Sequence, residues 1–172
     1  YNIMSQIYTV KRLDSMAFEW QLKEIELTEK YDLENYNISQ TYSQISSYYI
    51  NTNQPEKALE ALKKADATAY SPTQKISVQL EYVNYYSKFG DMQAAEKILN
   101  ECKTAFDQDK RLWSIKKRLY NIEYVYYLQS KQYPKALEAA KKQEAEELNL
   151  SESIQNSVHY LTKGKIYSNM GN

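Results

Sequence analysis

An all-α fold built from repeated helical hairpins is predicted by three features of this 172-residue sequence. Only 3 Gly and 3 Pro interrupt the chain, which favours long helices joined by short turns. Alanines recur at positions 17, 58, 95 and 136, separated by 41, 37 and 41 residues. Each alanine follows a tyrosine by nine residues, at positions 8, 49, 86 and 127. These spacings predict a repeat of about 40 residues, and repeats of that length are typical of helical arrays.

The constant gap of nine residues fixes the turn inside each unit, so the variable part lies between units. Each tyrosine ends one helix and each alanine lies early in the next. A fifth tyrosine, Tyr167, follows Tyr127 by 40 residues. We expect one solenoid domain over residues 1–172, with repeats at about 1–32, 33–70, 71–109 and 110–149 and a half repeat at 150–172. The expected helices are 2–10, 14–30, 33–52, 55–69, 72–89, 91–106, 110–131, 133–148 and 151–170.

The expected helix ends carry matching capping signals. Pro55 and Pro134 stand where a first helical turn tolerates a missing N–H group. Gly90 offers a left-handed stop, and the following Asp91 is a good N-cap. Residues 71–74 read Ser-Pro-Thr-Gln, which has the spacing of a capping box. The signals therefore agree with helix boundaries drawn from the repeat.

The second helix of a unit is predicted to bury a stripe of small and large apolar residues. Ala58, Leu62 and Ala65 are spaced at i, i+4 and i+7, so they lie on one face of a helix. Glu60 and Lys64 form an i,i+4 ion pair on the solvated side, as Glu138 and Lys142 do in a later unit. The alanines thus let two helices approach closely. The unit of Ala17 departs from this pattern, because Gln21 and Glu24 replace the expected apolar or small residues.

Tyrosine is unusually frequent, with 18 residues, and it forms doublets at 48–49, 85–86 and 126–127. We expect the second member of each doublet to pack on the alanine helix of its own unit. The first member points about 100° further round the helix, so it should meet the neighbouring unit. The doublets are therefore predicted to form core contacts.

The same residues carry a resemblance to a known family. A large residue, a small one and an aromatic precede a small-large-small stripe, as in Tyr42-x2-Ile45-Ser46-x2-Tyr49 followed by Ala58-x3-Leu62-x2-Ala65. This pattern resembles the tetratricopeptide repeat family, and its period near 40 resembles the longer-helix variants of bacterial signalling proteins. The resemblance implies a right-handed superhelix, an α–α solenoid of about four and a half repeats. It also implies a non-catalytic module that binds proteins or peptides.

Catalytic and metal-binding signals are missing from the sequence. His159 is the only histidine, and the single cysteine, Cys102, occupies a small position of the Ala95 stripe. No phosphate-binding loop or Cys/His cluster is present. We therefore expect no enzyme, no catalytic residue, no metal and no cofactor.

Charge and hydropathy narrow the class of partner. Lys plus Arg and Asp plus Glu both total 22, so the net charge does not favour nucleic acid. The basic run from Lys110 to Leu119 is interpreted as a solvated helix face. No apolar run approaches the length of about 18 residues that a membrane span needs.

The partner is expected on a concave groove lined by the first helix of each unit. Residues one place beyond the buried ones should face this groove: Ser43, Ser47, Ile50, Leu80, Asn84, Ser87, Asn121, Val125, Leu128, Leu161, Lys165 and Ser168. Among these only Lys165 is charged. The groove therefore suits a protein or peptide partner, with an apolar segment or helix laid along it.

A second function is left open by the sequence. The chain begins with Tyr1 rather than Met and stops at Gly171-Asn172, where another helix is due. We expect it to be a segment of a longer chain. It could then be the sensory or regulatory domain of a bacterial signalling protein, such as a histidine kinase or a transcription regulator. The sequence selects neither cytoplasm nor periplasm, and it sets no oligomeric state.

Overall fold

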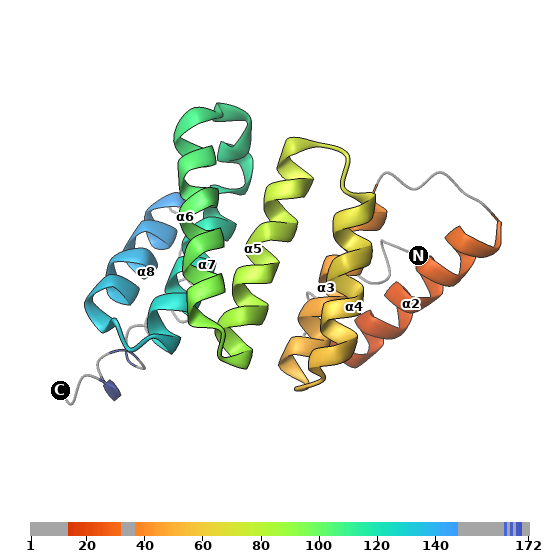
Figure 1. Cartoon of the computed structure of the whole chain (residues 1–172), viewed down its shortest axis with the longest axis horizontal. Helices are drawn as coiled ribbons and strands as arrows, with labels where there is room; N and C mark the ends of the chain where they lie inside the picture. Colours follow the sequence, from red (N-terminus) through yellow and green to blue (C-terminus); the bar gives the residue numbers. More distant parts are fainter. Residues whose placement is uncertain (1–13, 32–36, 148–163, 165, 167, 170–172) are drawn as a thin grey trace. The chain divides into compact units, whose positions relative to one another are not determined.

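The computed structural model describes residues 14–31, 37–147, 164, 166, 168 and 169. Within these residues the chain is helical and contains no strand (Figure 1). The elements are α2 (Asp14–Lys30), α3 (Ile38–Asn51), α4 (Pro55–Thr68), α5 (Pro72–Phe89), α6 (Met92–Gln108), the 3-10 helix η1 (Lys110–Ile115), α7 (Lys116–Gln129) and α8 (Tyr133–Glu147). The predicted all-α fold of helical repeats is confirmed. The helices expected at 2–10 and, except for isolated residues, at 151–170 lie outside the described part.

The chain divides into two compact units, Tyr1–Glu81 and Tyr82–Asn172. The division falls inside α5. The first unit therefore holds α2, α3, α4 and the beginning of α5, and the second holds the rest. The single domain expected over residues 1–172 stays a prediction.

In the first unit, α3 and α4 form a tightly packed antiparallel hairpin. Ala58, Leu62 and Ala65 of α4 are each 0% exposed, as the stripe predicts. Ser39 of α3 donates a 2.8 Å hydrogen bond to the carbonyl oxygen of Ala65, and Ser46 donates one of 3.0 Å to that of Ala58. Side chains this short reach the neighbouring backbone only if the helices are close. Alanine on one helix and serine on the other make this approach possible.

Helix α2 also packs against α3, through aromatic contacts. The ring of Phe18 stacks on Tyr48 with centroids 4.0 Å apart, and it meets Tyr49 edge-on at 5.3 Å. The hydroxyl of Tyr42 donates a 2.8 Å hydrogen bond to Glu29 of α2. Tyr48 thus meets the neighbouring repeat, which confirms the prediction for the first member of this doublet.

The second unit repeats the small-residue packing. In α6, Ala95 is 0% exposed, and Leu99 and Cys102 are each 1% exposed. In the α7–α8 pair, Ala136 and Ala140 of α8 form a buried cluster with Ile166, and Tyr127 packs against it. The predicted burial of the alanine stripe is therefore confirmed in both units.

The turn inside each hairpin has a common backbone feature. Asn53, Gly90 and Lys131 have φ values of 58°, 98° and 60°, and each lies four residues after a repeated tyrosine. A left-handed residue at this place stops the first helix and reverses the chain. This shared turn explains why the gap of nine residues between tyrosine and alanine is constant.

Hydrogen bonds reinforce two of these turns in the same way. The N–H of Gln54 donates to the carbonyl of Tyr49 at 2.9 Å, and that of Gln132 donates to Tyr127 at 2.8 Å. Each glutamine amide also donates to the hydroxyl two residues earlier, at 2.9 and 3.0 Å. The bond from the second residue beyond the helix back to its last turn is that of a Schellman motif.

The other capping signals are also found. The Asp91 carboxylate accepts a 3.0 Å hydrogen bond from the N–H of Ala94 at the start of α6. Ser71 and Gln74 exchange bonds of 3.2 and 3.4 Å in a capping box.

The helix expected over 110–131 is instead divided into η1 and α7. The reason lies at Asp109, whose carboxylate accepts a 2.9 Å bond from the N–H of Arg111 and so favours a tight 3-10 turn.

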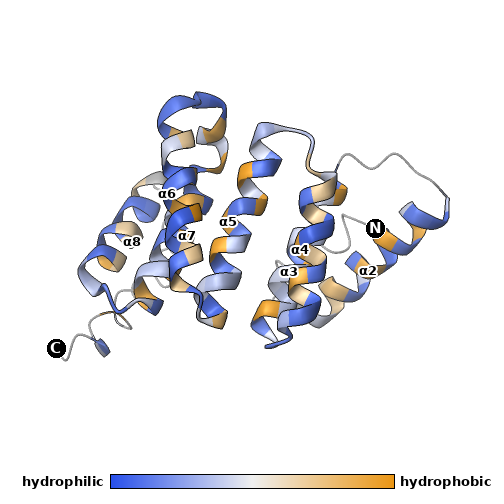
Figure 2. Cartoon of the chain, viewed as in Figure 1, coloured by the Kyte–Doolittle hydropathy of each residue, from blue (hydrophilic) through white to orange (hydrophobic). Residues whose placement is uncertain are grey.

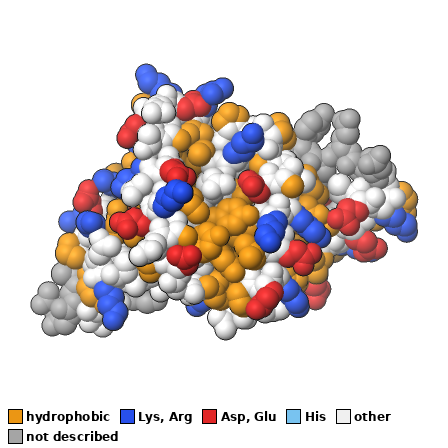
Figure 3. All heavy atoms as spheres, in the orientation of Figure 1, with side chains coloured by type: hydrophobic (Ala, Val, Ile, Leu, Met, Phe, Trp, Pro, Cys, Tyr) orange, Lys and Arg blue, Asp and Glu red, His pale blue; other side chains and the backbone are white. Residues whose placement is uncertain are grey.

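The surface is mixed in both polarity and charge. Hydrophilic and hydrophobic residues alternate around the helices, as expected for amphipathic helices that each bury one stripe (Figure 2). On the face drawn in Figure 3, acidic and basic side chains are interspersed. Among the described helices, none has both the length and the apolar character required to cross a membrane.

Candidate functional site

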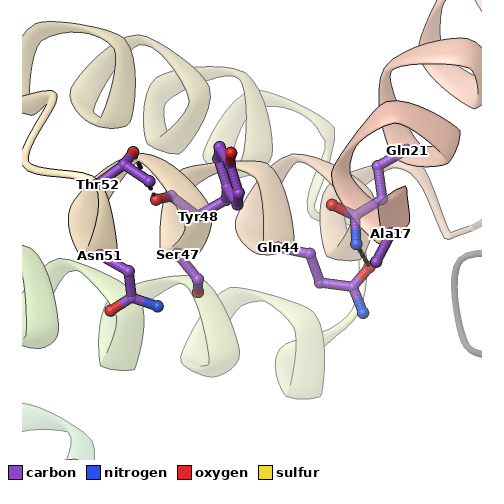
Figure 4. A pocket seen from close by; sticks show the side chains of 7 residues that line it. All are labelled: Ala17, Gln21, Gln44, Ser47, Tyr48, Asn51 and Thr52. Carbon is purple, nitrogen blue, oxygen red and sulfur yellow. Dashed lines mark hydrogen bonds between the residues drawn. The ribbon is translucent and has the colours of Figure 1, made fainter. Parts of the chain in front are cut away.

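The first unit contains a cavity of about 320 Å³ between α2 and α3. Its described lining carries carboxamides and hydroxyls together with one aromatic ring (Figure 4). Helix α2 supplies Ala17 and Gln21, while α3 supplies Gln44, Ser47, Tyr48, Asn51 and Thr52. None of these side chains is ionised, so the site offers hydrogen bonds and apolar contact without a charge.

Two glutamines orient each other at one end of the cavity. The Nε2 of Gln21 donates a 3.0 Å hydrogen bond to the Oε1 of Gln44 (Figure 4). Gln21 is only 5% exposed, so its amide is held in place by packing. Because the oxygen of Gln44 accepts this bond, the Nε2 hydrogens of Gln44 are directed to other acceptors. Gln44 itself is exposed, so those acceptors can belong to a partner.

Ser47 contributes a hydrogen-bond acceptor to the cavity, whereas Gln44 contributes a donor. Its hydroxyl donates a 2.7 Å hydrogen bond to Glu81 of α5, which is 3% exposed. The lone pairs of the Ser47 oxygen can then accept a hydrogen bond from the cavity side. Asn51 is exposed one turn further along α3, and its side-chain amide can both donate and accept a hydrogen bond. A donor at Gln44, an acceptor at Ser47 and a group with both functions at Asn51 therefore follow one another along this face of α3.

The expected exposure of the groove residues needs correction in the first unit. Ser43, Ile50 and Leu80 are 3%, 2% and 0% exposed, so their side chains belong to the core. Ser43 and Ile50 lie on α3, which packs against α2 and α4 and is hydrogen-bonded to α5 through Ser47, so more of this helix is covered than the repeat pattern predicts. What remains open lies about one residue further along, at Gln40, Gln44, Ser47 and Asn51, although Ser47 is half-buried.

The second unit gives a mixed result for the same prediction. Ser87 is 4% exposed, and its hydroxyl donates a 2.6 Å hydrogen bond to the carbonyl of Val83 within α5. Asn121 is exposed, and Asn84, Val125 and Leu128 are half-buried. Leu128 packs against the Ala136–Ala140 cluster. Lys165 and Leu161 lie outside the described residues, and Ser168 is exposed. Their role in partner binding stays a prediction.

The sequence signal for the cavity was a polar residue in an apolar position. Gln21 follows Ala17 by four residues, where the other units place Leu62, Leu99 and Ala140. A glutamine at this position cannot be buried without a hydrogen-bond partner, so it indicates a neighbouring polar group. The partner, Gln44, belongs to the next unit and could not be identified from spacing alone.

Cys102 is placed where the stripe predicts. Burial, with a smaller contribution from the Glu101 charge, raises the pKa of the thiol to about 12. A thiol with so high a pKa is a poor nucleophile at neutral pH. Within the described ranges no three His, Cys, Asp or Glu side chains are grouped so as to hold a metal ion. His159 lies outside those ranges.

Comparison with protein-family models matches residues 9–142 to the family described as 26S proteasome subunit RPN7. The match spans α2 to α7 and most of α8. Comparisons with curated proteins and with solved structures give no significant match. The helical-repeat character expected from the sequence is supported by the family match, whose description does not name tetratricopeptide repeats.

Proposed function

Since the chain belongs to the family of the 26S proteasome subunit RPN7, we propose that it is a non-catalytic helical-repeat scaffold that binds other proteins within an assembly. The observation that carries this proposal is the family match over residues 9–142, because the family is that of a subunit of a larger assembly. A subunit acts by contact with its neighbours. Helical hairpins stacked through small-residue stripes supply extended surface for such contacts.

The partner-binding site of the first unit is proposed to be the open face of α2 and α3. Gln44, Ser47 and Asn51 offer neutral donors and acceptors in succession, which suit the N–H and C=O groups of a polypeptide. Tyr48, stacked on Phe18, adds an apolar wall for a side chain of the partner. The expected apolar segment would therefore be bound by its backbone as well as by its side chains. Asn121 and Val125 are the corresponding candidates in the second unit.

The test is a double substitution with a matched control. Gln44→Arg with Asn51→Arg places two bulky cations on the open face of α3. Gln93→Arg with Asn100→Arg makes the same changes on α6, where a glutamine and an asparagine are also exposed and seven residues apart. Each tagged chain is recovered from its own cells, and co-purified proteins are quantified by mass spectrometry.

We expect the partner to be lost from the α3 variant and retained by the α6 variant, at equal melting temperatures. Raising the salt concentration should change recovery of the wild type little, because the cavity lining is uncharged. Equal recovery with both variants, or loss with the α6 variant alone, would place the interaction elsewhere.

The finer predictions from the sequence remain proposals. A long-period tetratricopeptide array would present the same kind of face, so that reading is compatible with a scaffold. The alternative of a sensory domain in a bacterial signalling protein has no support from the family description, which names neither a kinase nor a transcription regulator.

A further inference from the structure

A large aromatic side chain is held outward on η1. Trp113 is 55% exposed, whereas its neighbour Leu112 is 2% exposed and packs in the core. The bond from the N–H of Arg111 to the Asp109 carboxylate fixes the start of η1, and the Arg111 guanidinium is paired with the same carboxylate at 2.7 Å. The exposure of Trp113 is therefore set by a capped turn that is anchored on its buried side.

Two lysine side chains lie close to the indole ring of Trp113. The Nζ atoms of Lys110 and Lys116 lie 5.7 and 5.6 Å from the ring centroid of Trp113. Lys116 also lies 5.7 Å from the ring of Tyr120. Cations at these distances are attracted to the ring faces. An exposed apolar surface is thus combined with positive charge.

A cavity of about 330 Å³ adjoins this aromatic side chain. Its lining includes Trp113, Lys116, Tyr120, Lys103, Glu123 and Lys142. Lys103 is paired with the buried carboxylate of Glu123 at 2.9 Å, and Lys142 with Glu138 at 2.7 Å. All of these residues belong to the second unit. The cavity has room for a side chain placed beside the indole.

Basic residues are concentrated in the stretch of sequence that carries Trp113, although the whole chain has no net charge. Residues 110–118 hold five basic residues and no acidic one, while the net charge of the chain is zero. Lys110, Arg111 and Lys117 of this stretch are exposed. We propose that Trp113 and the basic side chains of residues 110–118 form a docking surface for an acidic protein segment that carries an apolar side chain. Trp and Arg are frequent anchors of protein interfaces, and complementary charge favours an acidic partner.

The observations favour an acidic polypeptide over a nucleic acid. Asp107 and Glu123 also line the cavity, and Asp109 is paired with Arg111, so carboxylates interrupt the basic surface. A continuous phosphate backbone would be repelled at these places, whereas a polypeptide can position its acidic residues to avoid them. A separate apolar side chain is also needed to use the cavity.

The test uses the whole chain and a defined peptide. The probe is a fluorescein-labelled peptide of about 12 residues, made of Asp and Glu around one Leu. Binding is followed by anisotropy, and in a Trp20→Phe background by the emission of Trp113, which is then the only tryptophan. Lys110→Glu with Lys117→Glu reverses two charges of the surface. Lys63→Glu with Lys75→Glu makes the same change at exposed lysines of the first unit.

We expect saturable binding that changes the emission of Trp113. It should weaken about tenfold or more in Trp113→Ala and in the Lys110/Lys117 variant, and little in the Lys63/Lys75 variant. Raising salt from about 0.05 M to about 0.5 M should also weaken it strongly. Far-ultraviolet circular dichroism and urea midpoints check that the variants are folded.

Four outcomes would overturn the proposal. The first is the absence of saturable binding. The second is equal binding of a peptide with Lys in place of Asp and Glu, and the third is equal weakening in the Lys63/Lys75 control. The fourth is tighter binding of a single-stranded oligouridine of similar length, which would assign the surface to nucleic acid.

Discussion

Ser46 of α3 donates a 3.0 Å hydrogen bond to the backbone carbonyl of Ala58 on α4. Seven residues away on each helix, in the opposite order, Ser39 does the same to Ala65 at 2.8 Å. The two bonds therefore define one antiparallel register. They connect the small-residue stripe seen in the sequence to the close approach of the helices in the fold.

Ser46 is expected to contribute through both its size and its hydroxyl. Ser46→Ala removes the hydrogen bond and should lower the free energy of unfolding by about 0.5–1.5 kcal/mol. Ser46→Leu adds volume where the packed helices leave no space, and it should lower the free energy of unfolding further, by about 1–3 kcal/mol or more. Urea denaturation measures both. Ser114→Ala is the control, because Ser114 is exposed on η1. A cost for Ser46→Leu as small as that of the control would mean that the helices are not in close contact.

The stripe and the solvated face should respond differently to substitution. Ala58→Leu or Ala95→Leu should overpack a helix contact and cost about 1–3 kcal/mol, since both alanines are 0% exposed. Lys64→Ala and Lys142→Ala remove exposed i,i+4 pairs of 3.5 and 2.7 Å and should cost less than about 0.5 kcal/mol. The opposite ranking of urea midpoints would show that the buried face has been misassigned.

The left-handed residues of the turns give predictions of opposite sign. Gly90→Ala should destabilise by about 1 kcal/mol, because φ is 98° there while an added Cβ would meet no atom within 4 Å. Lys131→Gly should stabilise by about 0.5–1 kcal/mol, because φ is 60° at a residue that carries a side chain. Thermal unfolding of the two variants tests this. A stabilising Gly90→Ala would contradict the proposed role of the turn.

High pH is expected to weaken the fold through two buried acids. Burial raises the pKa of Cys102 to about 12, and burial together with the hydrogen bond to Glu29 raises that of Tyr42 to about 12. The ordinary values are 9.0 and 10.0, so between about pH 9 and pH 12 the unfolded chain loses protons that the folded chain keeps. The free energy of unfolding must then fall as pH rises through this window.

Cys102→Ala isolates the thiol part of this effect. Its stability should decline less steeply between about pH 9 and pH 12 than that of the wild type, by at most about 1.4 kcal/mol per pH unit, the limit for one proton. Urea midpoints at several pH values give the slopes. Parallel slopes, or rapid reaction of native Cys102 with a thiol reagent near neutral pH, would show that the thiol is not buried.

Much of the fold could be predicted because it depends on local patterns. Ala58, Gly90 and Asp91 each carry a spacing or a capping preference that is visible without tertiary structure. The break before α7 was missed, because it depends on how the Asp109 carboxylate competes for the N–H of Arg111. Such competition between side chain and backbone is not periodic, so the helical pattern continued across it.

The candidate site was harder to predict than the fold. Helical spacing locates a face of a helix to within about one residue, or 100°. A shift of one residue on α3 leads from the buried Ile50 to the exposed Asn51. The exposure of α3 is set by three neighbouring helices, whose placement the sequence pattern does not give. The polar exception at Gln21 was visible, but its meaning depended on a partner 23 residues away.

Site-specific photo-cross-linking can determine whether a partner protein contacts the open face of α2 and α3. A photo-reactive phenylalanine analogue is placed at position 44, or at position 93 as the exposed control on α6, and the cells are irradiated. Cross-linked products are identified by mass spectrometry. We expect a discrete adduct with a partner protein from position 44 and none from position 93. An adduct from position 93 alone, or a co-purifying partner that never cross-links to position 44, would contradict it.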